Sequence, residues 1–173
     1  STILIARSPD AVGGNGMVVS SHQLASEIGI DILKKGGNAI DAAIATGFAL
    51  AVVHPGAGNI GGGGFMVIRL ADGKVTTIDF REVAPNFAFK DMFLDDSLNV
   101  IQGKSWNTAL ATGVPGSVAG FGMAHEKYGK INWKKLVYPS MKLAKNGFPL
   151  DYQNMQYLNH PYYKEYLSRD IEA

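Results

Sequence analysis

Apolar residues recur at helical spacing near the start of the chain and predict a helix with one buried face. Just before it, the segment GMVVS at 16–20 predicts a short buried strand. Ser20 followed by Gln23 is the signature of a capping box, which predicts that the helix begins after Ser20. Gly36 or Gly37 can supply the left-handed residue that ends it. The apolar stripe comprises Leu24, Ala25, Ile28, Gly29, Ile32 and Leu33.

A second helix is predicted from Ala39 to about Val53, and it is apolar on nearly all sides. Asp41 and Thr46 are its polar exceptions, and Asn38 can cap its first turn. Pro55 ends it. Because a helix that is apolar all round has to bury every face, we expect this one in the middle of the fold.

Two strand-like segments flank Asp72-Gly73, a dipeptide typical of tight turns, and predict a β-hairpin from Phe65 to Phe80. A two-residue turn at this dipeptide places Phe65 opposite Phe80 and Gly64 opposite Arg81. In this register, a glycine-rich run and the residues around Arg81 meet at the open end of the hairpin.

The second half of the chain contains two further predicted helices. After Arg81 the pattern loosens, until a helix begins with Pro115 at its first helical position and runs to Tyr128. The next is capped by Asn132 and reaches Asn146, with Pro139 as a break or kink. A glycine follows each helix and stops it. The tail from Asp151 to Ala173 shows no clean period and ends without a stop signal, as if the chain were cut there.

Composition favours a globular domain and offers little to other classes of function. The 173 residues are 46% hydrophobic, which is enough for a core. A formal net charge of +1 creates no field that would attract nucleic acid or an anionic membrane. The longest apolar run, 42–53, is shorter than the ~20 residues that a membrane helix needs. Without cysteine and with four scattered histidines, we expect neither a metal site nor a cofactor.

The stretch HPGAGNIGGGGF raises the question of a phosphate-binding loop. Gly56 to Gly61 fits the pattern G-x-G-x-x-G, but a dinucleotide loop follows a strand and opens a helix. Here a predicted helix comes first and a strand follows, and no Lys-Ser or Lys-Thr closes the loop. One interpretation is that the glycines only permit sharp turns and close packing. The other is that Gly61, Gly62, Gly63 and Gly64 leave room for a small molecule beside a guanidinium group.

Arg81 is the candidate binding residue at this end of the hairpin. A guanidinium group binds a carboxylate through two parallel hydrogen bonds better than any other side chain. The alternative is that Arg81 forms a surface ion pair with Asp79 or Glu82. These two carboxylates can also orient the arginine.

Four motifs in this order resemble the N-terminal part of the large subunit of bacterial γ-glutamyltranspeptidases. They are GGNAIDAA at 36–43, GNIGGGG at 58–64, DFRE at 79–82 and GVPGSVAG at 113–120. The resemblance covers roughly Gly16 to Leu150, so we interpret 1–173 as a single partial domain.

The resemblance implies an N-terminal nucleophile hydrolase with an αββα four-layer α/β fold, of which this chain is the N-terminal portion. Members are made as one precursor that cuts itself into a large and a small subunit. The N-terminal Thr of the small subunit attacks the γ-glutamyl amide, and the acyl group passes to water or to an amino acid or peptide. The implied function is γ-glutamyl transfer and hydrolysis, for example on glutathione or glutamine, in the periplasm or outside the cell.

The resemblance also assigns roles to residues of this chain. The Arg of the family's DFRE segment binds the α-carboxylate of the γ-glutamyl donor, and that residue is Arg81 here. The glycines 61–64 and Glu82 are interpreted as shaping the pocket. The nucleophilic Thr has no counterpart in these residues, so the implied partner is the small subunit of the same precursor, and no cofactor is implied.

Three alternatives remain open from the sequence. Two are enzymes of the same fold, a cephalosporin (glutaryl) acylase and a poly-γ-glutamate depolymerase. The third is a truncated, non-catalytic relative that binds a carboxylate ligand or a partner subunit.

Overall fold

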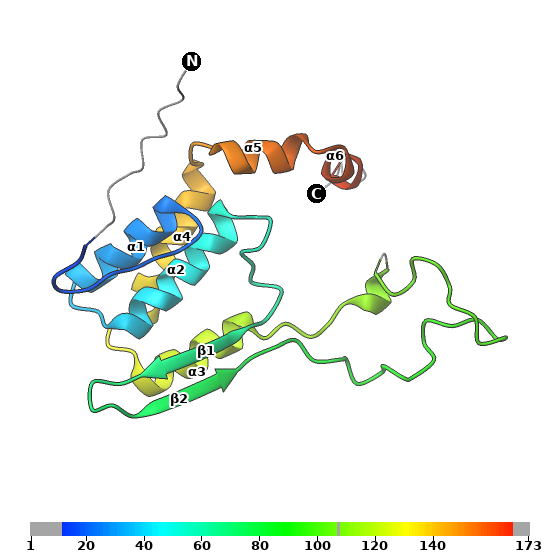
Figure 1. Cartoon of the computed structure of the whole chain (residues 1–173), viewed down its shortest axis with the longest axis horizontal. Helices are drawn as coiled ribbons and strands as arrows, with labels where there is room; N and C mark the ends of the chain where they lie inside the picture. Colours follow the sequence, from blue (N-terminus) through cyan, green and yellow to red (C-terminus); the bar gives the residue numbers. More distant parts are fainter. Residues whose placement is uncertain (1–11, 107, 168–173) are drawn as a thin grey trace, which may run out of the picture.

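One central helix organises the fold. The computed structural model describes residues 12–106 and 108–167. Helix α2 lies between α1 and α4 on one side and α3 with the hairpin on the other (Figure 1). Helices α5 and α6 extend from one end of this helical body. The elements are α1 (Gln23–Lys34), α2 (Ala39–Val53), β1 (Phe65–Arg69), β2 (Val75–Asp79), the 3-10 helix η1 (Ala109–Ala111), α3 (Ser117–Tyr128), α4 (Trp133–Asn146), α5 (Tyr152–Asn159) and α6 (Pro161–Leu167).

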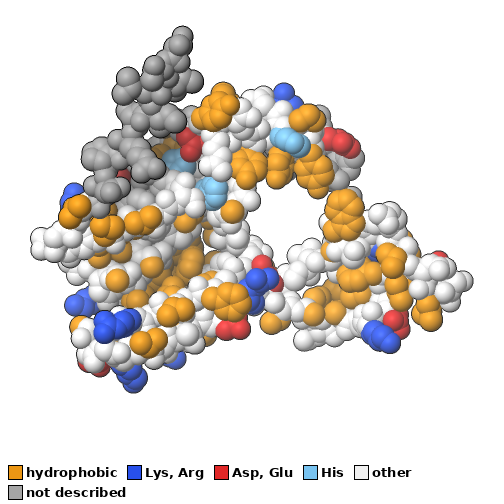
Figure 2. Space-filling view, viewed as in Figure 1, with side chains coloured by type: hydrophobic (Ala, Val, Ile, Leu, Met, Phe, Trp, Pro, Cys, Tyr) orange, Lys and Arg blue, Asp and Glu red, His pale blue; other side chains and the backbone are white. Residues whose placement is uncertain are grey.

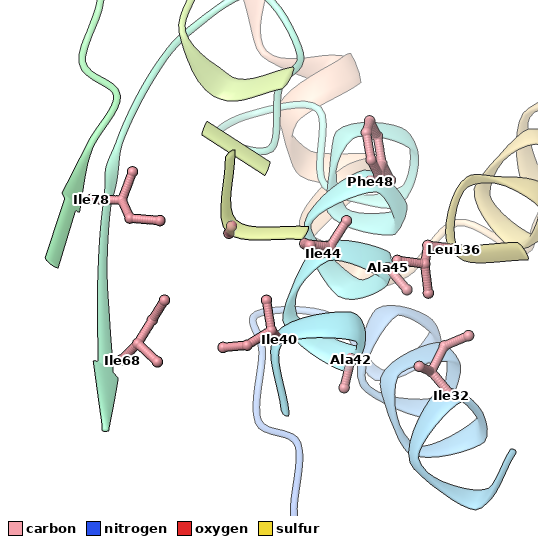
Figure 3. Packing of buried hydrophobic residues seen from close by; sticks show 10 residues of the cluster. Ile32, Ile40, Ala42, Ile44, Ala45, Phe48, Ile68, Ile78 and Leu136 are labelled. Carbon is pink, nitrogen blue, oxygen red and sulfur yellow. The ribbon is translucent and has the colours of Figure 1, made fainter. Parts of the chain in front are cut away.

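The core is built around α2, as its apolar sequence predicts. Ile68 and Ile78 of the hairpin point toward Ile40 and Ile44 of α2, and Leu136 of α4 closes the opposite side (Figure 3). Because strands alternate their faces, the same alternation turns Phe65 and Val67 away from this core. The hairpin therefore has one buried face and one open face.

The carboxyl group of Asp41 is buried in this core, and both of its oxygens accept hydrogen bonds from backbone N–H groups. Asn38 and Asp41 form a capping box at the start of α2. The carboxylate of Asp41 also accepts hydrogen bonds from the backbone N–H groups of Lys130 and Ile131. One side chain thus joins the first turn of α2 to the connection between α3 and α4.

The predicted start of the first helix is wrong in its capping residue. Helix α1 begins at Gln23, and the N–H of Leu24 donates to Nδ1 of His22 at 3.2 Å. Ser20 is outside the helix and donates to the carbonyl of His22 instead. The left-handed Gly36, with φ of 88°, ends the helix as expected.

The predicted buried strand at 16–20 is also wrong. Met17 and Val19 are 52% and 82% exposed, and the segment is not a strand. Within the described residues, its backbone makes no hydrogen bond to another strand. An apolar β-branched sequence needs such a partner to become a strand.

The hairpin exists where predicted, but its register is shifted by one residue. Phe65 pairs with Asp79 instead of Phe80. Leu70 and Lys74 close the loop, which contains Ala71, Asp72 and Gly73. Gly73 adopts φ of 87°, the left-handed position that ends the usual three-residue hairpin loop. The dipeptide was correctly placed in the turn, but the turn has one more residue than expected.

The later helices agree with the sequence in part. Helix α3 begins at Ser117 with Gly116 as its N-cap, so Pro115 precedes the helix and is not its first residue. Helix α4 is capped by Asn132 and continues through Pro139, so of the predicted break or kink the break is wrong.

Helices α5 and α6 were not predicted. Asp151 caps α5, and the buried Asn154 donates from Nδ2 to the carbonyl of Val53 at the end of α2. Hydrophobic periodicity does not reveal an anchor made by a polar side chain. The predicted end of the chain at 171–173 lies outside the described residues. None of the helices that the structure describes is long and apolar enough to cross a membrane.

Candidate functional site

The open end of the hairpin brings the glycine run against the DFRE segment. Gly64 and Phe80 exchange two backbone hydrogen bonds, of 3.0 and 3.4 Å. This places Gly63, and not Gly64, beside Arg81. A Cβ atom on Gly63 would lie 2.5 Å from the carbonyl oxygen of Phe80 and 2.8 Å from Cα of Arg81. Only glycine permits so close an approach of the two backbones.

Arg81 and Glu82 form the surface ion pair that the sequence left open. Nε of Arg81 donates to Oε2 of Glu82 at 3.0 Å, and the backbone N–H of Arg81 donates to Asp79. The arginine side chain is 60% exposed. No acceptor among the described residues binds its two terminal nitrogens. The ion pair therefore fixes one edge of the guanidinium group and leaves its end free for a ligand.

The carboxyl of Glu82 is held in its charged form. Its own backbone N–H bonds to it and lowers its pKa below the usual value, against a partial desolvation that acts in the opposite direction. The charge and the hydrogen bond of Arg81 lower the pKa further, and so does the N–H of Gly63. Glu82 therefore remains an acceptor for Nε of Arg81 at neutral pH.

A hollow of about 510 Å³ begins at this ion pair. Arg81 and Glu82 form its polar end, and it extends along the irregular excursion 83–113, which the bridge between Val83 and Val114 closes at its base. The excursion forms a lobe that is separated from the helical body by an opening (Figure 2). The volume suits a small molecule, and beyond Arg81 and Glu82 the wall of the hollow is largely apolar. The apolar lining includes Val83, Pro85, Met92, Phe93 and Leu110.

The four predicted glycines, 61–64, do not line this hollow. The carbonyl of Gly62 accepts from the N–H groups of Gly116 and Ser117, and its N–H donates to Oδ1 of Asn59. The glycine loop is therefore docked on the first turn of α3. Since the N–H groups of Gly62 and Gly64 are already bonded within the protein, the loop does not present them to a phosphate, in agreement with the inverted order of helix and strand.

Sequence reasoning missed two residues of this region. Asn59 holds the glycine loop through Gly62 and also accepts from Oγ of Ser117. Phe65 lies beside Arg81, whose guanidinium carbon is 5.8 Å from the ring centroid. The wrong register concealed Phe65, because it placed the ring opposite Phe80. The signal for the correct register was Gly73: a three-residue hairpin loop needs a left-handed residue in its third position, and glycine adopts that conformation readily.

The described residues also bear on two other kinds of site, a metal centre and a nucleophilic serine. Among residues 12–106 and 108–167, no three side chains of the ligand types gather as they would around a metal ion. Ser117, the serine of the GVPGSVAG motif, is buried and bonded to Asn59.

Comparisons with known proteins place this site in context. A family profile described as Gamma-glutamyltranspeptidase matches residues 25–171. The glutathione hydrolase proenzyme of Escherichia coli is 57% identical over 133 residues, which are 77% of this chain and 23% of that protein. The chain thus spans about a quarter of the length of the curated relatives it matches.

Solved structures are similar over nearly the whole chain. The γ-glutamyltranspeptidase of Helicobacter pylori has a TM-score of 0.82 and 49% identity, covering 91% of this chain and 48% of that one. A cephalosporin acylase from Bacillus halodurans has a TM-score of 0.72 but only 26% identity, covering 97% of this chain and 32% of that one.

Proposed function

Because the chain belongs to the γ-glutamyltranspeptidase family, as its motifs predicted, we propose that it is the N-terminal part of the large subunit of a self-processing γ-glutamyltransferase and glutathione hydrolase. Its fold is that of the N-terminal portion of an N-terminal nucleophile hydrolase. The names of the curated relatives, glutathione hydrolase proenzymes, support both the reaction and the processing.

The function of this chain in that enzyme is to bind the substrate. One observation carries this assignment: Arg81 lines the hollow, its Nε is occupied by Glu82, and no acceptor among the described residues binds its two terminal nitrogens. A carboxylate placed there accepts two parallel charge-assisted hydrogen bonds. The α-carboxylate of a γ-glutamyl donor is such a group, and its binding holds the γ-amide at a fixed distance for attack.

The nucleophile and the second subunit come from the rest of the precursor. An N-terminal Thr in the small subunit attacks the γ-amide, with its own amino group as base, and the acyl-enzyme is resolved by water or by an amine. The proposed location is the periplasm or the outside of the cell. The identity of 26% to the cephalosporin acylase, against 49% and 57% to the γ-glutamyl enzymes, favours a γ-glutamyl donor over a glutaryl one.

The test replaces Arg81 in the full-length protein. We expect Arg81→Ala and Arg81→Lys to raise KM for a γ-glutamyl donor by at least about 30-fold, because a lysine presents a point charge and not a two-pronged fork. Arg69→Ala is the matched control, since Arg69 lies on the same hairpin and does not line the hollow. Intact-mass analysis should show a second polypeptide that starts with Thr in each sample. Unchanged donor binding in both Arg81 variants would contradict the assignment.

A further inference from the structure

The outer face of the hairpin carries an aromatic ring next to the binding arginine. Phe65 stands directly opposite Asp79, and Arg81 follows Asp79 by two residues. Because alternate residues of a strand share a face, Phe65 and Arg81 lie on the same side as diagonal neighbours. The guanidinium carbon is 5.8 Å from the ring centroid, within the range of a cation–π contact.

The guanidinium group is thus held from two directions. Glu82 binds its Nε edge, and its central carbon lies over the ring of Phe65. Neither contact uses the terminal nitrogens, and a carboxylate approaches those nitrogens in the plane of the group. The ring therefore does not compete with a bound carboxylate.

Such contacts reduce the conformational entropy that the Arg81 side chain loses when a ligand binds. Arg81 is 60% exposed, and a long exposed side chain loses rotamer freedom when it binds. A side chain already confined near its binding geometry loses less, so the ligand binds more tightly. Phe65 is not part of the core of the described residues, because it is 66% exposed on the face of the hairpin opposite Ile68 and Ile78.

We propose that Phe65 is a positioning residue for Arg81: its ring confines the guanidinium group so that the terminal nitrogens are directed at the carboxylate of the donor. This inference rests on the proposed function, and it adds a residue that contacts no substrate atom. It makes Phe65 a determinant of affinity for the carboxylate and not of the acyl transfer itself.

The experiment uses the full-length, processed enzyme and two ligands that differ in one group. Glutamate carries the α-carboxylate, whereas 4-aminobutanoate lacks it and keeps the amine and the second carboxylate. We expect Phe65→Leu to raise the competitive inhibition constant of glutamate about three- to tenfold, with kcat changed less than twofold. The constant of 4-aminobutanoate should not change. Phe65→Tyr, which keeps the ring, should retain the wild-type value for both ligands.

Val67→Ala is the matched control on the same face of the same strand. Val67 is 74% exposed and pairs with Thr77, one step further from Arg81 along this face. It should leave both inhibition constants unchanged. Phe65→Met replaces Phe65→Leu if that precursor does not mature.

The outcomes separate this inference from the function on which it rests. If Arg81→Ala weakens glutamate binding and Phe65→Leu does not, the positioning role is wrong and the carboxylate anchor stands. If Arg81→Ala has no effect, the anchor is wrong and the inference fails with it. Equal changes for both ligands in Phe65→Leu and Val67→Ala would reveal a general packing effect, which also overturns the proposal.

Discussion

At the scale of single residues, the site depends on how Arg81 divides its hydrogen-bond donors. Its Nε–H group donates to Glu82 within the protein, and the N–H groups of the two terminal nitrogens remain for a ligand. The sequence alone offered an ion pair and a binding arginine as alternatives. The geometry makes them compatible, because a guanidinium group has five N–H donors and Glu82 takes one of them.

The charge of Glu82 gives stability a pH dependence that can be measured. Its pKa is lower in the folded protein than in the unfolded chain, so its contribution is complete above the ordinary value near 4.5 and is lost as pH falls through the lowered value. We expect the difference in urea midpoint between wild type and Glu82→Gln to be constant from pH 8 to about 5.5 and to shrink below pH 4.5. Glu126→Gln, an exposed charge on α3, serves as the control. A difference that grows on acidification would contradict the assigned direction of the shift.

At the scale of elements, the sequence predicted those helices and strands whose bounds are set by nearby residues. Helices α1 to α4 and both strands lie within a few residues of their predicted bounds, because caps, glycine stops and periodicity act locally. The register did not follow from Asp72-Gly73, since two- and three-residue loops can both accommodate this dipeptide. Residues 16–20 and helix α5 could not be predicted, because their state depends on distant partners: a strand to pair with, and the carbonyl of Val53.

The candidate site was predicted in part: the sequence indicated Arg81 and the glycine run but not the residues that hold them in place. The convergence of the glycine run with Arg81 followed from the hairpin, and the one-residue shift in register replaced Gly64 by Gly63 as the glycine that faces it. Asn59 and Phe65 did not follow, because their contacts cross between segments whose relative placement depends on the register and on the position of α3.

The glycine loop provides a matched pair of substitutions. A Cβ atom on Gly63 would meet backbone atoms at 2.5 and 2.7 Å, whereas one on Gly61 would meet nothing within 4 Å. We expect Gly63→Ala to lower the free energy of unfolding by about 1–3 kcal/mol and to weaken donor binding, because the DFRE segment has to move. Gly61→Ala should change the free energy of unfolding by less than about 0.5 kcal/mol. Urea denaturation and donor KM measure both, and equal effects of the two variants would argue against the close approach at Gly63.

At the scale of the whole molecule, a large apolar surface stays open. Phe65, Val67 and Val75 are more than half exposed on the outer face of the hairpin, and further apolar side chains are exposed on the excursion 83–113 (Figure 2). Exposed apolar area of this extent marks an interaction surface. In a four-layer fold, a second sheet covers such a face.

This surface predicts opposite effects of one substitution in two contexts. In residues 1–173 expressed alone, Val75→Lys should reduce association and the binding of an apolar dye, because a charge interrupts the exposed face. In the full-length precursor, the same substitution should reduce the yield of processed enzyme, because the lysine would be buried without a partner. Size-exclusion chromatography and gel analysis of processing measure the two effects. Normal processing of Val75→Lys would show that this face remains open to water.

The buried carboxylate of Asp41 has a consequence for synthesis on the ribosome. Its partners in the backbone, Lys130 and Ile131, are made 89 and 90 residues later. Until they leave the exit tunnel, the carboxyl group in the first turn of the central helix lacks these hydrogen-bond donors, and its burial costs free energy. The helical body is therefore completed late in translation, and the shortest nascent chain that can close it has to extend beyond residue 131.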